Sequence, residues 1–272
     1  MAFLSIFEYV DGMNICVDRT NAKNFDTAED MDRLDENDFQ VLKFIYKHGL
    51  VTTKFIDVYK RQTGLVDYGF KGKKKQYEKY GLVNSCYIRS PNGERSITMY
   101  MLTEMAADYI KGKFGLEASV NSGYILRQIE KNDAMGLLKR MALVQFLICS
   151  LDVKDYRIVT GELYDAVIEY NDDPVKYYVR VVRCHNEDIA DVKDFVKHVD
   201  NNISGKRAAI ILCEYVDLII DVGRILDEIE TNVELYYQTD IFALDFPETF
   251  QDVEVNGNSY KLTDKSRPKS CA

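Results

Sequence analysis

A short run of lysines that ends in a tight turn constrains this chain more than any other stretch. Residues 70–83 read FKGKKKQYEKYGLV and place five lysines within nine residues of a chain whose formal net charge is −9. A helix here would carry Lys71, Lys75 and Lys79 four residues apart, so their ammonium groups would form one stripe. The Tyr-Gly-Leu-Val ending predicts that the helix stops at the glycine and that a strand follows.

The composition predicts a folded protein of one large domain or two ordinary ones. The chain has 272 residues, of which 46% are hydrophobic, enough for a packed core. No apolar stretch is long enough to span a bilayer and no secretion signal is recognisable, so we expect a cytoplasmic protein that does not bind membranes. The six cysteines stand singly. We therefore expect reduced structural thiols, no metal site and no cofactor.

Charge is distributed very unevenly along the chain. Residues 1–42 carry a net charge of −7, residues 43–113 carry +8, and residues 114–272 carry −10. A basic segment between two acidic ones predicts a localised surface that binds an anion. A chance fluctuation of local charge is the alternative, but this basic segment coincides with a regular pattern of secondary structure.

The basic segment reads as three helices, a hairpin and a fourth helix. Residues 34–50 have the pattern of an amphipathic helix, with Asp35 as its N-cap, Asp38 in its favourable first turn and Gly49 as its C-terminal stop. A second short helix follows Thr52 and ends at Gly64, and the third helix holds the lysines. Two strand-like runs, 84–90 and 96–102, enclose the turn sequence Ser-Pro-Asn-Gly, in which proline presets φ and Asn-Gly tolerates positive φ.

This order resembles the winged helix-turn-helix domain of bacterial DNA-binding proteins. The resemblance covers roughly residues 34–115 and includes YGLV after a basic helix, a hairpin, and the closing MYMLTEMAADYI. It implies that the lysine helix enters the major groove and that the wing tip, 90–95, touches the adjacent backbone or the minor groove. One departure is Lys74, at a position that is usually apolar. Phe70 and Tyr77 would then face the core, helped by the aliphatic stem of the lysine.

The resemblance implies a set of DNA-binding residues between positions 52 and 95. Lysines neutralise phosphates, Gln76 can pair with an adenine edge, and the start of the second helix would meet a phosphate. A solvated lysine-rich helix in a module that contacts only protein is the alternative. The expected DNA-binding residues are Thr52, Thr53, Lys54, Lys71, Lys73, Lys74, Lys75, Gln76, Lys79, Arg89, Asn92 and Arg95.

The segments around the basic domain complete the expected organisation. Residues 1–33 read as a hairpin with a turn at Asp11-Gly12, followed by an acidic linker. Because an isolated hairpin is only marginally stable, it must pack on something, and a homodimer is one possibility. Residues 116–131 are expected to form a linker helix. Residues 251–272 are expected to form a tail with a small hairpin.

Residues 132–250 predict an α/β domain with a mixed sheet, in the order α-β-β-β-α-β-α-β. The apolar run 207–213 predicts a buried central strand. The order resembles the restriction-endonuclease-like core. Such domains follow winged helices in proteins of mobile elements, including the replication-relaxation family of plasmids and conjugative transposons. This second resemblance concerns topology alone.

The nuclease resemblance implies a Mg²⁺ site of which the sequence contains only a part. Such a site needs an Asp on the second strand and a Glu-x-Lys on the third. Asp165 stands in the second predicted strand, but the third, 175–183, contains no acidic residue, although Glu162 and Glu169 could substitute. We therefore expect a non-catalytic scaffold that serves assembly or partner binding.

Taken together, the sequence favours an α+β protein that binds double-stranded DNA without catalysis. The expected role is an accessory or regulatory factor of a plasmid or conjugative element, in replication, transfer or transcription. The expected partners are double-stranded DNA, a second copy of the chain, and proteins that contact the α/β domain. The alternatives are a Mg²⁺-dependent nuclease that uses Asp165 and a protein-interaction module, such as an antitoxin-like or phage-defence component, without DNA affinity.

Overall fold

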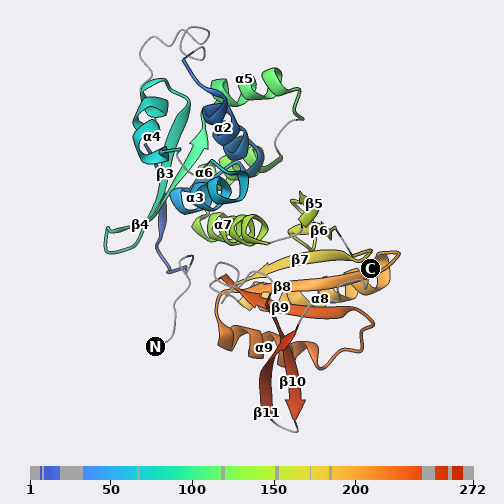
Figure 1. Ribbon diagram of the computed structural model, residues 1–272. Coiled ribbons are helices and arrows are strands. Elements are labelled where there is room, and N and C mark those ends of the chain that lie inside the picture. The colour runs from blue at the N-terminus through green and yellow to red at the C-terminus, as the bar shows by residue number, and fades with distance from the viewer. Residues whose placement is uncertain are drawn as a thin grey trace. The chain divides into compact units, whose positions relative to one another are not determined.

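The chain forms two compact units that each contain helices and a sheet (Figure 1). The first unit comprises residues 9–137 and the second comprises residues 1–8 and 138–272. The chain is therefore an α+β protein, as the sequence predicts. The computed structural model describes residues 7, 9–18, 33–65, 68–117, 120–150, 153–171, 173–183, 186–240, 249–256 and 259–265.

The first unit is built on an antiparallel sheet with the strand order β1-β3-β4-β2. Within residues 34–115 the elements follow the predicted order of three helices, a hairpin and a helix. The elements are β1 (Asn14–Asp18), α2 (Glu36–His48), β2 (Val51–Thr52), α3 (Thr53–Thr63), α4 (Phe70–Lys79), β3 (Val83–Arg89), β4 (Arg95–Leu102), α5 (Glu104–Phe114) and α6 (Val120–Lys131). The last helix, expected as a linker, belongs to this unit.

Helix ends in this unit lie where the sequence places them. Asp35 accepts a hydrogen bond from the backbone N–H of Asp38 at 2.8 Å, and its own N–H donates to the Asp38 carboxylate at 3.1 Å. This reciprocal pair is a capping box that satisfies two backbone donors at the start of α2. Gly49 and Gly64 end α2 and α3 with φ of 74° and 77°, a region that costs glycine little.

Strand β1 has its partner within the chain. Gly12 occupies the predicted turn with φ of 86°, and β1 then runs antiparallel to β3, with Asn14 opposite Arg89. The side chain of Asn132 accepts a hydrogen bond from the N–H of Ile15 at 2.8 Å. A homodimer was expected because the hairpin would otherwise lack a packing partner. This reason does not hold for β1, which pairs with β3 of its own chain. The other predicted strand of that hairpin and the acidic linker lie largely outside the described residues.

The second unit contains a mixed sheet with the strand order β11-β10-β9-β8-β7-β6-β5. Strands β7, β8 and β9 are parallel, and the other neighbours are antiparallel. The hairpin β10–β11, expected in the tail, joins this sheet through β9. The elements are α7 (Ala134–Cys149), β5 (Val153–Ile158), β6 (Ala166–Tyr170), β7 (Lys176–Val182), α8 (Asn186–Asn202), β8 (Arg207–Cys213), α9 (Val216–Leu226), β9 (Glu234–Thr239), β10 (Phe250–Asn256) and β11 (Ser259–Lys265).

Both faces of this sheet are covered, which makes three layers. Side chains of α8 and α9 pack with Tyr178 and Tyr237 in one apolar core. The neighbouring tyrosines, Tyr177 and Tyr236, point to the opposite face because side chains alternate along a strand. There, the ring centroids of Tyr236 and Phe250 are 5.4 Å apart, and the Phe250 ring in turn contacts a phenylalanine of α7. The predicted central strand is β8, which is buried from Ala208 onward.

The described residues include four of the six cysteines. Cys16, Cys86, Cys149 and Cys213 are free thiols, and the last three are buried. Cys184 and the final residues of the tail lie outside the described part of the chain. Within the described ranges, no helix combines the length and the apolar character needed to cross a bilayer.

Burial of His48 predicts a loss of stability in mild acid. The ring lies 4.6 Å from that of Phe44, and burial, with a smaller effect of the Lys47 charge, lowers the pKa of His48 to about 3. The unfolded chain binds the proton near pH 6.5, so the free energy of unfolding should fall as the pH drops below that value. We expect a loss of about 2 kcal/mol at pH 5.

Urea unfolding at several pH values checks this expectation. In His48→Gln, the difference in stability between pH 7 and pH 5 should shrink by about the same amount. Parallel pH profiles for the two proteins would show that the imidazole can be protonated without cost in the folded state.

Candidate nucleic-acid interface

Helix α4 divides its side chains between the core and the solvent. Phe70 and Tyr77 are buried, as predicted, and the rings of Phe70 and Tyr100 meet edge to face at 5.2 Å. Lys71, Lys75 and Lys79 are exposed. Each four-residue step turns a helix by about 40°, so the three lysines share an arc of about 80°. They lie opposite the buried face of the helix, and we call them the lysine stripe.

Lys73 does not belong to the lysine stripe. Its Nζ lies 2.9 Å from Oδ2 of Asp38 and 3.5 Å from Oδ2 of Asp35. The Asp38 side chain is completely buried, so Lys73 neutralises a carboxylate inside the unit. The hydrogen bond to Asp38 raises the pKa of Lys73 above its ordinary value. This ammonium group is therefore held by the protein itself.

Lys74, the departure noted in the sequence, also has partners within the unit. Its Nζ lies 4.8 Å from the ring centroid of Tyr100 and 3.6 Å from Oε1 of Glu78. The ammonium group thus lies over an aromatic ring of β4 and close to a carboxylate of its own helix. The expected contribution of its aliphatic stem to the core beside Phe70 and Tyr77 stays a prediction.

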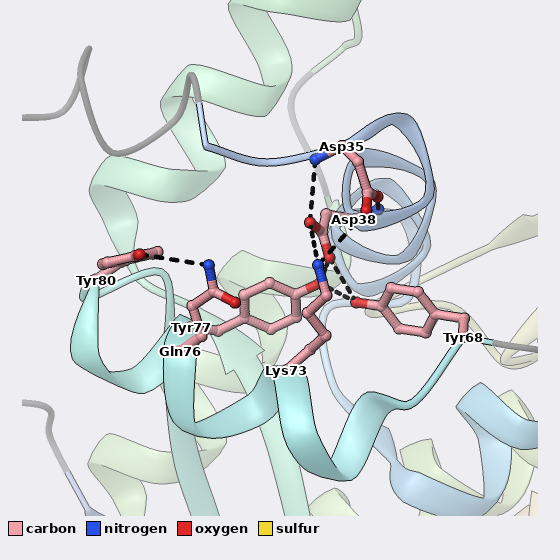
Figure 2. Close-up of polar contacts among 7 residues, drawn as sticks. All are labelled: Asp35, Asp38, Tyr68, Lys73, Gln76, Tyr77 and Tyr80. Atoms are coloured by element: carbon pink, nitrogen blue, oxygen red, sulfur yellow. Dashed lines mark hydrogen bonds and ion pairs between the residues drawn. The ribbon is translucent and has the colours of Figure 1, made fainter.

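Asp38 connects α2 to α4 and to Tyr68, which precedes α4. Its Oδ1 accepts hydrogen bonds from the hydroxyls of Tyr77 at 2.6 Å and Tyr68 at 3.1 Å (Figure 2). The two hydroxyls also contact each other. Burial and the Asp38 charge raise the pKa of Tyr68, so its phenol stays protonated and can donate. We call Asp38, Tyr68, Lys73 and Tyr77 the Asp38 cluster.

Sequence reasoning identified Asp38 only as a favourable acid in the first turn of α2. Its partners Tyr68 and Tyr77 are 30 and 39 residues away along the chain. A local pattern cannot report such a distance. The one available indication was an acidic residue beside the apolar Phe39, because an acid that becomes buried requires partners.

Gln76 borders the lysine stripe. It is partly buried, and its amide donates a hydrogen bond to the hydroxyl of Tyr80 at 3.3 Å (Figure 2). An amide NH₂ has two hydrogens and the side chain also has a carbonyl oxygen, so this bond leaves groups that can pair with a base edge. Gln76 therefore lies on the flank of the exposed stripe, and its pairing with a base edge stays a prediction.

The start of α3 contributes one exposed cation. The Thr52 hydroxyl accepts a hydrogen bond from the N–H of Phe55 at 3.2 Å and thus caps the helix. Thr53 is partly buried, and Lys54 is exposed. None of Lys54, Lys71, Lys75 and Lys79 makes an ion pair with another residue that the structure describes.

In the turn between β3 and β4, polar side chains form hydrogen bonds within the turn itself. The side-chain oxygen of Asn92 accepts a hydrogen bond from the N–H of Glu94 at 3.2 Å and also contacts the hydroxyl of Ser90. Arg89 is exposed, and its guanidinium donates to the hydroxyl of Tyr87 at 3.3 Å. The backbone of Arg95 opens β4, but its side chain lies outside what the structure describes.

In the second unit, Asp165 faces a cation. Its Oδ2 accepts a hydrogen bond from the N–H of Val181 at 2.8 Å and lies 3.9 Å from Nη1 of Arg180. The nuclease alternative requires an acidic cluster around Asp165, and the described residues form none. They also contain no group of three or more His, Cys, Asp or Glu that could hold a metal ion. Glu169 pairs instead with Lys176 at 2.9 Å.

Arg183, another cation of the third predicted strand, is fully buried. It directly follows β7, and its guanidinium forms a bidentate ion pair with Asp240, at 2.7 and 3.2 Å. Both side chains have no exposed area. A buried pair of this geometry satisfies its own charges and connects the ends of two strands.

Comparisons with protein families, with curated proteins and with solved structures find no match for this chain. A functional proposal therefore depends on the arrangement of its side chains. The lysine stripe on α4 places three exposed cations, without an ion pair to any described residue, on a single helical face.

The Asp38 cluster yields a stability prediction with an internal control. In Asp38→Ala, Lys73 and two tyrosine hydroxyls lose their acceptor, so we expect the free energy of unfolding to fall by about 2–4 kcal/mol. Asp35→Ala removes the more exposed member of the same capping box and should cost about 1 kcal/mol. Urea unfolding monitored by circular dichroism compares the two, and equal losses would show that Asp38 acts only as a helix cap.

Proposed function

We propose that residues 34–115 are a winged helix-turn-helix that binds double-stranded DNA, with α4 as the recognition helix. The observation that carries this proposal is the lysine stripe on a helix whose opposite face is fixed to the core. An α-helix fits the major groove, which is about 12 Å wide. Ammonium groups along its outer face can then neutralise phosphates on either side of the groove.

The connectivity of the unit supports this proposal. The elements α2, β2, α3, α4, β3 and β4 follow one another, and the three strands among them form one antiparallel sheet. The sequence resemblance implied this order of helices and hairpin. Lys54 adds an exposed cation in the first turn of α3, where backbone N–H groups also favour a phosphate.

Several of the expected DNA-binding residues have partners within the unit. Lys73 and Lys74 have partners within the unit, and Thr52 and Asn92 close a helix cap and a turn. The remaining exposed cations are the natural phosphate contacts, and Gln76 is the side chain best placed to reach a base edge. We propose that the DNA contacts are made by Lys54, Lys71, Lys75, Gln76, Lys79 and Arg89.

For the second unit we propose a restriction-endonuclease-like scaffold without catalysis, which serves assembly or the binding of a protein partner. The order of α7 to β9 along the chain supports this view, and so does the position of Arg180 beside Asp165. The protein would then act as an accessory or regulatory DNA-binding factor of a plasmid or conjugative element. This role rests on the resemblance to mobile-element proteins in which a restriction-endonuclease-like domain follows a winged helix.

The dependence of affinity on salt tests the proposed function. Binding of a duplex, followed by fluorescence anisotropy, should weaken steeply as the salt concentration rises. The slope of log K against log salt is negative, and each of Lys71→Ala, Lys75→Ala and Lys79→Ala should reduce its magnitude by about 0.9. Lys111→Ala, which removes an exposed lysine from α5, should leave the slope unchanged. An absence of binding at low salt would favour the protein-interaction alternative.

Two glycines allow a charge-matched test of the docking face. Gly72 on α4 and Gly112 on α5 are both exposed within a helix, and a Cβ at either position would meet nothing within 4 Å. Glutamate should therefore be tolerated at both and should slightly raise helix stability. Gly72→Glu would place a carboxylate beside Lys71 and Lys75, so we expect DNA affinity to fall at least tenfold.

Gly112→Glu changes the net charge of the protein by the same amount on another helix. We expect its affinity to stay within about twofold of the parent protein at moderate salt, because screening confines charge effects to about 10 Å. Equal losses in the two variants would show that α4 is not the docking face.

A further inference from the structure

The wing of the proposed DNA-binding domain has an additional strand on its outer edge. In the sheet order β1-β3-β4-β2, strand β3 has a neighbour on each side. The pairing with β1 runs from Ser85, opposite Asp18, to Arg89, opposite Asn14. Strand β1 therefore accompanies β3 to its last residue. Figure 1 shows how the β3–β4 hairpin projects from the rest of its unit.

A turn of the N-terminal segment also packs beside the tip of the wing. The N–H of Met13 donates to the carbonyl of Val10 at 3.2 Å, which closes the turn around Gly12. A Cβ on Gly12 would lie 3.4 Å from Cγ of Pro91, the second residue of the wing turn. The tip, like the stem, is therefore three chain segments wide.

This width can be compared with the grooves of B-DNA. Neighbouring strands lie about 4.8 Å apart, so three segments measure about 10 Å between the outer backbones before side chains are counted. The minor groove is about 6 Å wide, whereas the major groove is about 12 Å wide. A wing of three segments is therefore too broad to enter the minor groove.

The side chains at the tip also disfavour insertion. Asp11 and Glu94 are both exposed in the two turns that flank Arg89. The minor groove has a strongly negative potential that attracts inserted cations and repels carboxylates. The side-chain oxygen of Asn92, which could otherwise accept from a guanine amino group, accepts from the N–H of Glu94. The described tip thus offers little that could read a base.

We infer that this wing lies along the phosphate backbone and that the protein recognises DNA through the major groove without inserting into the minor groove. The inference rests on the proposed binding of DNA by α4. Arg89 is then a phosphate contact at the flank of the site. Such a contact adds affinity and fixes the position of the protein, but it carries no sequence information.

Competition with groove-specific ligands tests this inference. Two duplexes, one rich in A·T and one rich in G·C, are bound to the full chain and titrated with distamycin, which occupies the A·T minor groove, or with methyl green, which occupies the major groove. Methyl green should displace the protein from both duplexes. Distamycin should change the affinity of the protein for the A·T-rich duplex by no more than about twofold, because distamycin and the protein would occupy different grooves. Displacement by distamycin would overturn the inference while leaving DNA binding established.

The variant Arg89→Ala gives an independent measurement. We expect it to weaken binding to the two duplexes by the same factor and to reduce the magnitude of the slope of log K against log salt by about 0.9. A loss confined to the A·T-rich duplex would contradict the inference, because it would place the guanidinium in the minor groove. If neither duplex is bound by the unmodified protein, the proposed function itself fails, which is a different result from either of these.

Discussion

A single buried carboxylate, that of Asp38, determines how the first unit presents its charge. It lies in the first turn of α2 and receives hydrogen bonds from residues before and within α4. An isolated buried anion would be very costly, so the surrounding donors must stay in place. The orientation of α4 is thereby fixed to α2, and the lysine stripe faces away from the core. The proposed interface depends on this orientation, because phosphates can be neutralised only by cations that reach them.

The same lysine-rich segment performs two physical tasks. Lys73 compensates the Asp38 charge, and the Lys74 ammonium group lies over an aromatic ring of β4. The stripe lysines, by contrast, have no charge partner among the described residues. A protein with a formal net charge of −9 could neutralise such cations with its many acids. Their exposure therefore concentrates positive potential on one helical face. In the proposed complex with DNA, β1 and its turn would limit how the β3–β4 hairpin approaches the duplex.

In the second unit, two arginines of the third predicted strand form ion pairs with aspartates of the same unit. Arg180 lies beside Asp165, and Arg183 forms a fully buried bidentate pair with Asp240. In a metal-dependent nuclease, carboxylates at comparable positions must converge on a cation from solution. Here arginine side chains supply the positive charge from within the chain. This arrangement agrees with the proposal that the unit supports assembly or partner binding.

The sequence by itself determined the elements of the basic segment, because caps, glycine stops and apolar periodicity act within a few residues. Asp35, Thr52 and Gly49 gave helix ends that the structure confirms, and the Ser-Pro-Asn-Gly turn gave the hairpin. The sequence also placed the lysines of the stripe on one face. Only the tertiary structure decided which lysines remain free, that β1 joins β3, and that the hairpin β10–β11 extends the main sheet. These outcomes depend on contacts between residues tens of positions apart, and such contacts produce no periodic pattern in the sequence.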